Sequence, residues 1–222
     1  KTRKRLLNFV IAGAGPTGVE LSGAIAEVRN NIIPKDYPDI DISEMKIHLL
    51  EGLDRVLPPM SEKASMKAEK FLKGLGVYIH LNTMVDDYDG ELVKTNTDES
   101  FETETFIWSA GVTGSPVKGL NASAIVDRAN RYQVNVFNQV EGYENVFAIG
   151  DIALMKSEEY PKGHPMVAQP AIQQGKHLAK NLERIIKKQK LEPFNYFDKG
   201  TMATIGRNKA VVDLNKSTFG GF

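Results

Sequence analysis

Cysteine is absent from this chain of 222 residues. The chain therefore cannot form a disulfide bond, a thiolate metal site or a redox-active dithiol within its span. No metal site of any other kind is predicted from the sequence. A fold that depends on covalent cross-links is excluded, so the chain has to be stabilised by its core.

The chain also lacks a net charge and a long apolar run. Its 28 Lys and Arg residues are balanced by 28 Asp and Glu residues, so composition gives no indication of a nucleic-acid partner. An apolar run of about 18 residues does not occur, which excludes a transmembrane helix within the chain. The basic residues 1–5 lead directly into an apolar strand, so no signal peptide is expected. The length accommodates one large or two small domains.

The most informative pattern that is present is a glycine motif behind an apolar run. Residues 9–12 are Phe-Val-Ile-Ala, and Gly13-x-Gly15-x-x-Gly18 follows, with a helical pattern after it. This strand, turn and helix context is the one that a dinucleotide-binding motif requires. Gly13 permits the tight turn, Gly15 permits the backbone to approach a pyrophosphate, and Gly18 permits close packing of helix on strand. The alternative is a glycine-rich turn with a structural role only.

The helix that follows is expected to face the two phosphates with its first turn. Pro16 and Thr17 lie in this turn, where the missing N–H of a proline costs little. Free backbone N–H groups and the positive end of the helix dipole favour an anion there. We therefore count both residues among the cofactor-binding positions.

An acidic residue at the end of the second strand is expected to select the nucleotide. Glu51 closes the apolar run 45–50, and a carboxylate at this place accepts hydrogen bonds from ribose hydroxyls and repels a 2′-phosphate. It comes later than the usual spacing of roughly 20 residues, because residues 30–41, with two prolines, are expected to form a long loop. The sequence thus favours NADH over NADPH. A surface glutamate at a strand end is the alternative.

The remaining pattern predicts an α/β protein with a Rossmann-like domain. Residues 61–75 have helical spacing, residues 85–104 are expected to form antiparallel hairpins, and residues 105–112 a buried strand. That strand ends in the small residues Ala110 and Gly111, which leave room for a cofactor at the carboxyl end of the sheet. We expect a dinucleotide-binding domain at 1–115 and a second domain at 116–222.

The second part contains two further candidate sites. Residues 145–151 are expected to form an apolar strand that stops at Gly150 and Asp151, whose carboxylate can accept hydrogen bonds from a sugar-like chain. A helix is expected from Pro165 to about Gln189, and it carries small residues and amides near its start. The glutamines of this helix fit a ligand contact or a plain helix face equally well. Two strands are expected around Gly206.

Several of these segments together resemble a known family. The chain is similar to the two-dinucleotide flavoprotein oxidoreductases and, within them, to the type II NADH dehydrogenases, which are non-proton-pumping NADH:quinone oxidoreductases. The segments that carry the resemblance are 13–21 (GAGPTGVEL), 51–58 (EGLDRVLP), 108–112 (WSAGV), 146–151 (VFAIGD), 168–175 (AQPAIQQG) and 198–206 (DKGTMATIG). The last two are far more specific than the glycine motif.

The resemblance implies FAD and NADH as cofactors and a quinone as electron acceptor. It implies that Asp151 holds the ribityl chain of FAD and that Ala168, Gln169 and Gln173 line the quinone site. It also implies that Glu20 lies near the nicotinamide, where it can pair with Lys199, although a helix-start carboxylate favoured by the dipole is the competing interpretation.

The resemblance also implies what this chain does not contain. Members of the family begin with an FAD-binding glycine motif and end with an amphipathic segment that seats the enzyme on the membrane. Neither is present here, so we expect a soluble fragment, inactive by itself, with the carboxyl-terminal half of the FAD domain. The parent enzyme is then expected at the cytoplasmic face of the cell membrane, and a homodimer is one oligomeric state that the resemblance implies for it.

Two other functions remain open from the sequence. The first is a related flavin reductase with a protein or disulfide acceptor, against which the glutamine segment 168–175 argues. The second is a redox-silent NADH-binding module. Bound flavin and NADH-dependent quinone reduction in the full-length protein distinguish both from the quinone reductase.

Overall fold

The computed structural model describes residues 2–126, 128–214 and 217–221. The chain divides into two compact units, one formed by Lys1–Gly111 with Gly200–Phe222 and the other by Val112–Lys199. The sequence places all of 116–222 in one domain, whereas in the structure the last segment belongs with the first unit. The assignment of the two predicted domains to NADH and FAD stays a prediction.

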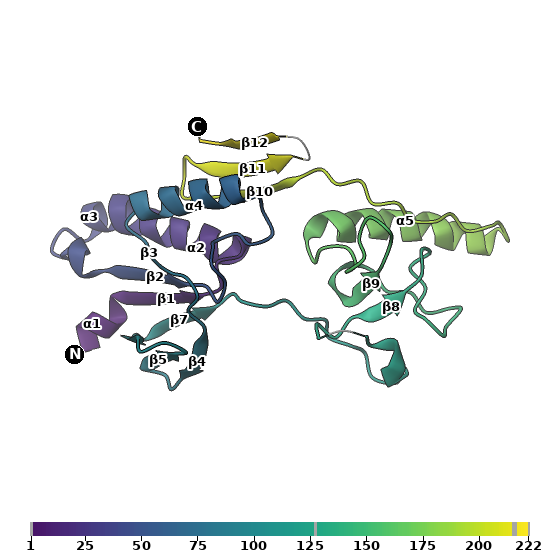
Figure 1. Ribbon diagram of the computed structural model, residues 1–222, viewed down its shortest axis with the longest axis horizontal. Helices are drawn as coiled ribbons and strands as arrows, with labels where there is room; N and C mark the ends of the chain where they lie inside the picture. The colour runs from purple at the N-terminus through teal and green to yellow at the C-terminus, as the bar shows by residue number, and fades with distance from the viewer. Residues whose placement is uncertain (1, 127, 215–216, 222) are drawn as a thin grey trace. The chain divides into compact units, whose positions relative to one another are not determined.

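The first unit is built on a parallel sheet (Figure 1). Its described strands run in the order β3-β2-β1-β7, and each pair of neighbours is parallel. The bounds are β1 Asn8–Ala12, β2 Lys46–Leu50, β3 Tyr78–His80 and β7 Thr105–Trp108. This confirms the predicted α/β fold with a Rossmann-like sheet.

Two helices cover one face of the sheet, α2 (Pro16–Glu27) and α4 (Glu62–Gly74), as Figure 1 shows. The alternation of side chains along β2 sends Ile47 and Leu49 into the core beneath these helices. The predicted helical spacing at 61–75 is confirmed, since the apolar residues Ala64, Ala68 and Leu72 share one face of α4 and are fully buried. Ser61 begins this helix by accepting a hydrogen bond from the Ala64 N–H.

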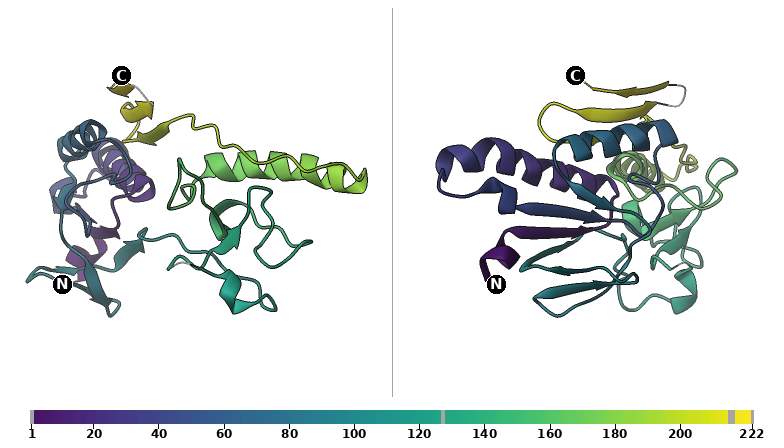
Figure 2. Two further views of the ribbon diagram at one scale, coloured as in Figure 1. Left: turned by 45° about the vertical axis from the view of Figure 1, so that its right-hand side comes forward. Right: turned by 60° about the vertical axis from the view of Figure 1, so that its left-hand side comes forward.

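The opposite face of the parallel sheet is covered by an antiparallel sheet, visible below it in the right-hand view of Figure 2. Its strands are β4 Val85–Tyr88, β5 Leu92–Thr95 and β6 Ser100–Glu102, paired in that order. The predicted hairpins at 85–104 are thereby confirmed. A second small core lies between the two sheets, formed by Val10, Leu50, Val93 and Phe101.

The end of the chain adds an outer layer on the helices α2 and α4. Strands β10 (Thr201–Thr204), β11 (Ala210–Leu214) and β12 (Ser217–Gly220) form an antiparallel sheet. The prediction of two strands around Gly206 is confirmed. Ala203, Ile205 and Val211 enter the main core of this unit, so the layer is part of its hydrophobic interior.

The predicted loop at 30–41 is largely helical instead. A π-helical segment, η1 (Val28–Ile32), follows α2 directly, and the short helix α3 (Ile33–Asp36) follows that. Pro34 stands in the first turn of α3, where proline is tolerated because that N–H has no partner within the helix. The late position of Glu51 thus comes from a longer helix. The other short helices of this unit are α1 (Thr2–Leu6) and η2 (Ile42–Glu44).

The second unit consists of a long helix and short strands around one core. Its elements are η3 Ala122–Ala124, β8 Tyr132–Val134, η4 Gly150–Ile152, β9 Ala153–Met155 and α5 Ala168–Ile186. Strands β8 and β9 pair in parallel. The core includes Tyr132, Val134, Met155, Phe194 and Tyr196.

The predicted strand at 145–151 is wrong. Phe147 forms only an isolated bridge with Gln139, and the strand β9 begins after the Gly-Asp pair. The backbone of the run bonds to the backbone of residues 138–140 through this bridge and two hydrogen bonds alone, too few for a regular strand, and the chain turns at Gly150, which has a φ of +69°. The long helix begins at Ala168, three residues later than predicted, and ends at Ile186.

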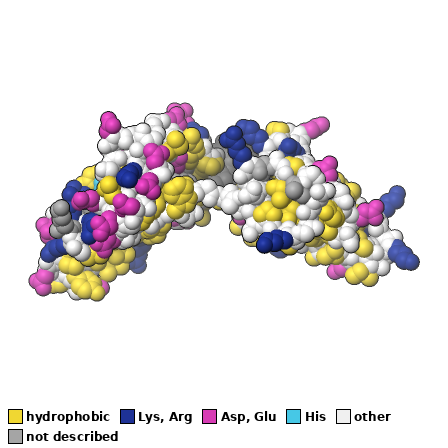
Figure 3. Space-filling model, turned by 90° about the horizontal axis from the view of Figure 1, so that it is seen from below, with side chains coloured by type: hydrophobic (Ala, Val, Ile, Leu, Met, Phe, Trp, Pro, Cys, Tyr) yellow, Lys and Arg dark blue, Asp and Glu magenta, His cyan; other side chains and the backbone are white. Residues whose placement is uncertain are grey.

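The surface carries charges of both signs. Over the face shown in Figure 3, Lys and Arg side chains are interspersed with Asp and Glu side chains, as the balanced composition predicts. Among the described residues, no helix has both the length and the apolar character that crossing a bilayer demands.

Candidate functional site

The parallel sheet brings three segments of the chain to one edge. Ala12, the last residue of β1, is in register with Leu50 of β2 and with Trp108 of β7. The residues that follow these strands, Gly13 and Glu51 among them, therefore lie side by side at the carboxyl end of the sheet. This is where open α/β sheets bind their ligands.

At two of the three motif glycines, neighbouring protein atoms leave no room for a side chain. Gly13 has a φ of +98°, and a Cβ there would lie 2.8 Å from the backbone of Ala110. At Gly18 a Cβ would lie within 3 Å of both the Gly13 carbonyl oxygen and the Ser109 hydroxyl oxygen. The Ser109 hydroxyl in turn donates to the carbonyl oxygens of Ala12 and Gly13, at 2.8 and 2.9 Å. These contacts hold the turn against the end of β7.

Gly15 differs from the other two glycines. A Cβ built on it meets no protein atom within 4 Å, and its φ of −68° suits any residue. Nothing inside the described protein therefore calls for glycine at this position. Gly15 is also the residue before α2, and because glycine has no side chain, no side-chain cap covers the first N–H groups of that helix. The open space and the uncapped helix start fit the approach of an anionic ligand.

Glu51 is tied to the glycine turn. One carboxylate oxygen, Oε2, accepts a hydrogen bond from the Ala14 N–H at 2.7 Å, and the other, Oε1, accepts from the Leu53 N–H at 3.0 Å. It is therefore not a loose surface side chain. Each oxygen of a carboxylate has two acceptor sites, so ribose hydroxyls still find acceptors there.

The predicted small residues after β7 lie beside the same turn. Ala110 contacts the position of Gly13, as described, and its carbonyl oxygen accepts a hydrogen bond from the Trp108 indole N–H at 2.6 Å. Gly111 is exposed, with a φ of +75°. Both positions thus belong to the edge at which the first unit presents its glycine turn.

Glu20 has a partner that the sequence did not predict. Its Oε1 accepts hydrogen bonds from the Thr204 N–H and hydroxyl, at 3.1 and 3.2 Å. A hollow of about 290 Å³ lies beside it, lined by Glu20, Ala24, Glu27, Thr204, Gly206 and Arg207. Lys199 belongs to the other unit, so its pairing with Glu20 stays a prediction.

In the second unit, the Gly150–Asp151 pair lies against the long helix. Gly150 approaches α5 so closely that a Cβ on it would lie 3.2 Å from the Ala171 Cβ. Its N–H donates to Oε1 of Gln174 at 2.7 Å. Asp151 is exposed, and within the described part of the chain no group is hydrogen-bonded to its carboxylate. Gln174 is a residue that the sequence analysis missed, because the motif alone did not show which glutamine faces the interior.

The predicted acceptor residues occupy the first two turns of α5. Ala168 opens the helix, and Gln169 is half-buried without a hydrogen bond from its amide to any described residue. Gln173 behaves differently, since its Nε2 donates to the Phe197 carbonyl oxygen and its Oε1 accepts from the Phe197 N–H, at 2.9 and 3.0 Å. Both ends of the Gln173 amide are thus engaged with backbone.

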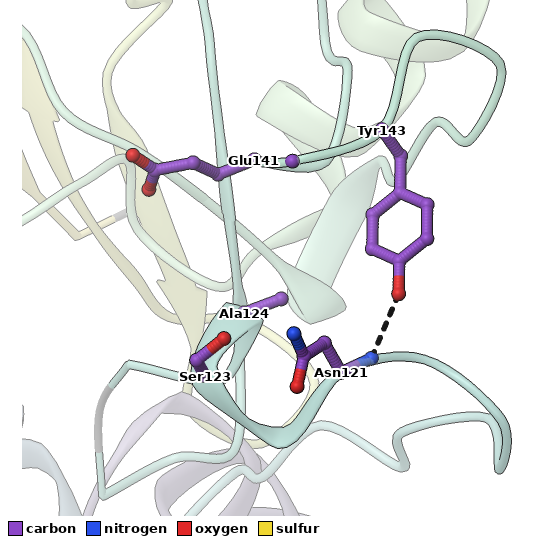
Figure 4. A pocket seen from close by; sticks show the side chains of 6 residues that line it. Asn121, Ser123, Ala124, Glu141 and Tyr143 are labelled. Atoms are coloured by element: carbon purple, nitrogen blue, oxygen red, sulfur yellow. Dashed lines mark hydrogen bonds between the residues drawn. The ribbon is translucent and has the colours of Figure 1, made fainter.

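A further hollow of the second unit includes none of the predicted residues. Its volume is about 500 Å³, and its lining is formed by Asn121, Ser123, Ala124, Glu141, Gly142 and Tyr143. Figure 4 shows the Tyr143 hydroxyl facing the Asn121 backbone, whose N–H donates to it at 2.9 Å. Among the described residues, no cluster of His, Cys, Asp and Glu is suited to a metal ion.

A glycine turn between a parallel strand and a helix, with a carboxylate at the end of the next strand, defines the class of Rossmann-like dinucleotide-binding proteins. Comparison with known sequences identifies the family. Residues 1–175 match the pyridine nucleotide-disulphide oxidoreductase family, and the chain belongs to it.

Within this family, the chain is similar to type II NADH:quinone oxidoreductases. The chain is 40% identical, over 99% of its length, to the type II NADH:quinone oxidoreductase Ndh of Mycobacterium tuberculosis. It is 32% identical, over 92% of its length, to the type II NADH:quinone oxidoreductase of Staphylococcus saprophyticus. These alignments cover 48% and 51% of the relatives, so the chain spans about half the length of the curated relatives it matches.

The fold is shared with a solved structure. The structure of NDH2 from Plasmodium falciparum in complex with NADH matches with a TM-score of 0.87 and 20% identity, covering 99% of this chain and 60% of that one. The likeness supports the predicted α/β fold. The predicted homology to type II NADH:quinone oxidoreductases is confirmed by the sequence relatives.

Proposed function

We propose that the whole protein carrying this chain is an NADH:quinone oxidoreductase, and that the chain contributes the NADH site and part of the FAD and quinone sites. The observation that carries this proposal is the similarity to the mycobacterial type II NADH:quinone oxidoreductases over nearly the whole chain. FAD, when bound, supplies the two-electron chemistry that connects NADH to a quinone. The residues of this chain bind and orient the partners.

The NADH site is proposed at the carboxyl edge of the parallel sheet. Gly13 and Gly18 hold the turn, and Gly15 leaves the space that a pyrophosphate needs beside the start of α2. Glu51 is already aligned on the turn by the Ala14 N–H, and it would accept the ribose hydroxyls. Ala110 lies against the same turn. These are the groups of this chain that we expect to contact NADH.

The FAD and quinone contributions are proposed for the second unit. Asp151 has an exposed carboxylate that accepts no hydrogen bond from any described residue, which suits the hydroxyls of a ribityl chain. Ala168 and Gln169 would lie at the quinone. Gln173 would act there through the Phe197 backbone, to which its amide is bonded. We also propose that Glu20 and Lys199 lie near the nicotinamide. For the whole protein we propose association with a membrane and a homodimer.

The NADH site can be tested with two alanine substitutions that differ in their steric consequences. Gly15→Ala places a methyl group in open space, so the melting temperature should stay unchanged while the NADH affinity falls at least about tenfold, because the pyrophosphate is blocked. Gly18→Ala collides with the Gly13 carbonyl oxygen and should lower the melting temperature. Calorimetric titration with NADH and thermal unfolding measure the two effects.

Unchanged NADH affinity in Gly15→Ala would contradict the proposed site. Failure of the unsubstituted chain to bind NADH at all would contradict it as well. Quinone reduction has to be measured separately, on the whole protein with FAD bound. A protein that binds NADH and FAD but reduces no quinone would be a reductase with another acceptor.

A further inference from the structure

The long helix α5 buries two amide side chains, Gln174 and Asn181, in the second unit. Gln174 and Asn181 are each 1% exposed, whereas Ile172 is 57% exposed and Ile186 82% exposed. Residues seven positions apart lie on the same face of a helix, so Gln174 and Asn181 form a buried polar row. A buried amide is costly unless it is hydrogen-bonded, and each of these two holds a different backbone segment.

Gln174 holds the turn that carries Asp151. Its Oε1 accepts the Gly150 N–H at 2.7 Å, and this N–H is the first of the turn η4 (Gly150–Ile152). The identity of the acceptor atom follows from the chemistry, since a backbone N–H can donate only to the oxygen of the amide. The turn is closed at its other end by the Ala153 N–H, which donates to the Gly150 carbonyl oxygen.

Asn181 holds a segment remote in sequence from that turn. Its Nδ2 donates to the Glu192 carbonyl oxygen at 2.9 Å, and its Oδ1 accepts the Glu192 N–H at 3.0 Å. Glu192 lies beyond the end of α5. The two buried amides therefore share helix, face and burial, and they differ in the backbone that they position.

We propose that Gln174 is a positioning residue for the flavin, because it sets the conformation of the Gly150–Asp151 turn from the helix that also carries Gln169. The inference rests on the proposed function, in which Asp151 binds the ribityl chain of FAD. Gln174 does not touch the cofactor in this assignment. It acts through the N–H of Gly150, a residue whose left-handed φ and close contact with Ala171 leave the turn little freedom.

The first test uses the 222-residue chain and hydrogen exchange of its backbone amides. Gln174→Met keeps the approximate shape of the side chain and removes the acceptor, so exchange should become faster at residues 150–152 and stay unchanged at 190–194. Asn181→Leu is the matched control and should produce the reverse pattern. If Gln174→Met leaves exchange at 150–152 unchanged, Gln174 does not position the turn and the proposal is overturned.

The second test measures FAD affinity in the whole protein by titration of the flavin absorbance and fluorescence. Gln174→Met should raise the Kd for FAD about tenfold, the effect of losing one well-placed hydrogen bond. Gln174→Glu retains an acceptor oxygen but places a carboxyl at a buried position, so it should restore affinity only when that carboxyl is protonated, with a lower Kd for FAD at about pH 5 than at about pH 8. Asn181→Leu should leave the Kd for FAD near that of the unsubstituted protein, even if it lowers the melting temperature.

The outcomes separate this proposal from the proposed function. If the unsubstituted protein binds FAD and Gln174→Met binds it equally well, the positioning role is overturned and the proposed function stands. An equal loss in Asn181→Leu would show that the effect is general destabilisation and would overturn the positioning role too. If the unsubstituted whole protein binds no FAD, both proposals fall together.

Discussion

The carboxylates of Glu51 and Glu20 both accept hydrogen bonds from the protein backbone. Glu51 receives two backbone N–H groups, and Glu20 receives the Thr204 N–H and hydroxyl. Such bonds orient a carboxylate without exhausting its acceptor capacity. A carboxylate that is already oriented loses little freedom when a ligand hydroxyl joins it, which is why the anchoring of Glu51 supports its proposed role.

Glu51→Gln should reduce the preference of the chain for NADH over NADPH. The substitution removes the negative charge that repels a 2′-phosphate while it keeps an acceptor for the Ala14 N–H. Calorimetric titration of both nucleotides into both proteins measures the change. Equal affinities of the unsubstituted chain for NADH and NADPH would contradict the assignment of Glu51.

A second residue-scale feature is a chain of hydrogen bonds between the two sheets of the first unit. His48 Nδ1 and His80 Nε2 are 3.0 Å apart, and His80 Nδ1 is 3.0 Å from Glu99 Oε2. Because Glu99 accepts from His80 Nδ1–H, Nε2 of a neutral His80 accepts from His48 Nδ1–H. Burial, then the charges of His80 and Lys46, lower the pKa of His48 to about 4.

The low pKa of His48 predicts an acid-sensitive fold. The unfolded chain takes up a proton at His48 near pH 6.5, whereas the folded chain does so only near 4. The neutral side chain therefore contributes stability above pH 6.5, and this contribution is lost progressively as the pH falls from 6.5 toward 4. A full shift of this size corresponds to about 3.4 kcal/mol, and solvent screening of the partly exposed side chain makes the actual change smaller.

Denaturant unfolding between pH 7 and pH 4 tests this expectation by comparison of the unsubstituted chain with His48→Phe. The variant keeps an aromatic ring beside Phe101, which the His48 ring contacts at a centroid distance of 4.8 Å. Its free energy of unfolding should decline less with acid. Parallel pH profiles for the two proteins would show that His48 does not carry the effect.

At the scale of elements, helix α2 holds the returning end of the chain along one face. Glu20 and Glu27 accept the N–H groups of Thr204 and Arg207. Between them Gly23 lies so close to the turn after β10 that a Cβ would be 2.5 Å from the Gly206 nitrogen. Residues three and four apart share a helix face. Glu20, Gly23 and Glu27 therefore lie on the face of α2 that contacts β10 and the turn after it.

Gly23→Ala should therefore destabilise the first unit, although alanine is the better helix former. The usual gain of about 1 kcal/mol for alanine over glycine in a helix is outweighed by the collision with backbone that cannot rotate away. Gly74→Ala is the control, because a Cβ there meets nothing within 4 Å. Thermal unfolding should show a lower melting temperature for Gly23→Ala and an equal or higher one for Gly74→Ala.

At the scale of the whole molecule, the first unit is completed only by the last segment of the chain. Ile205 and Val211 are almost fully buried in its core, although the whole second unit, Val112–Lys199, separates them from Gly111 in sequence. The glycine turn and Glu51 thus lie in a unit whose core is completed by a segment remote from them in sequence.

Removal of residues 200–222 should lower the free energy of unfolding of the first unit by more than about 3 kcal/mol. The reason is the exposure of the core beneath Ile205 and Val211, since each large buried aliphatic side chain contributes about 1.5–3 kcal/mol. Denaturant unfolding measures the loss. Phe219→Ala, at a side chain 56% exposed, should cost little, and an equal loss there would contradict the expected burial effect.

The proposed quinone site has to be tested in the whole protein with FAD bound. Gln169→Leu should raise the KM for quinone or slow flavin reoxidation, and it should leave flavin reduction by NADH nearly unchanged. Lys176→Leu places the same side chain two turns further along the same helix face and serves as the control. Stopped-flow measurement separates the two half-reactions, and a Gln169 variant slowed only in flavin reduction would contradict the quinone assignment.

The sequence by itself determined the parts that depend on neighbours along the chain. The glycine turn, the helical spacing at 61–75 and the hairpins at 85–104 follow from local periodicity and turn chemistry, and the structure has them. The motifs at 168–175 and 198–206 identified the family, because they are specific combinations of side chains. Glu51 was found because it directly follows a strand with a recognisable apolar pattern.

Only the tertiary structure decided which side chains meet across long distances. The backbone of the apolar run 145–149 pairs with that of residues 138–140 only through an isolated bridge and two hydrogen bonds, so its apolar composition suggested a regular strand that the structure does not have. Periodicity could not show that Gln173 binds the Phe197 backbone while Gln174 binds Gly150, since that depends on the rotation of α5 about its axis. Nor could it return β10 and β11 to the first unit, because a strand finds its layer through contacts with α2 and α4 that have no local signal.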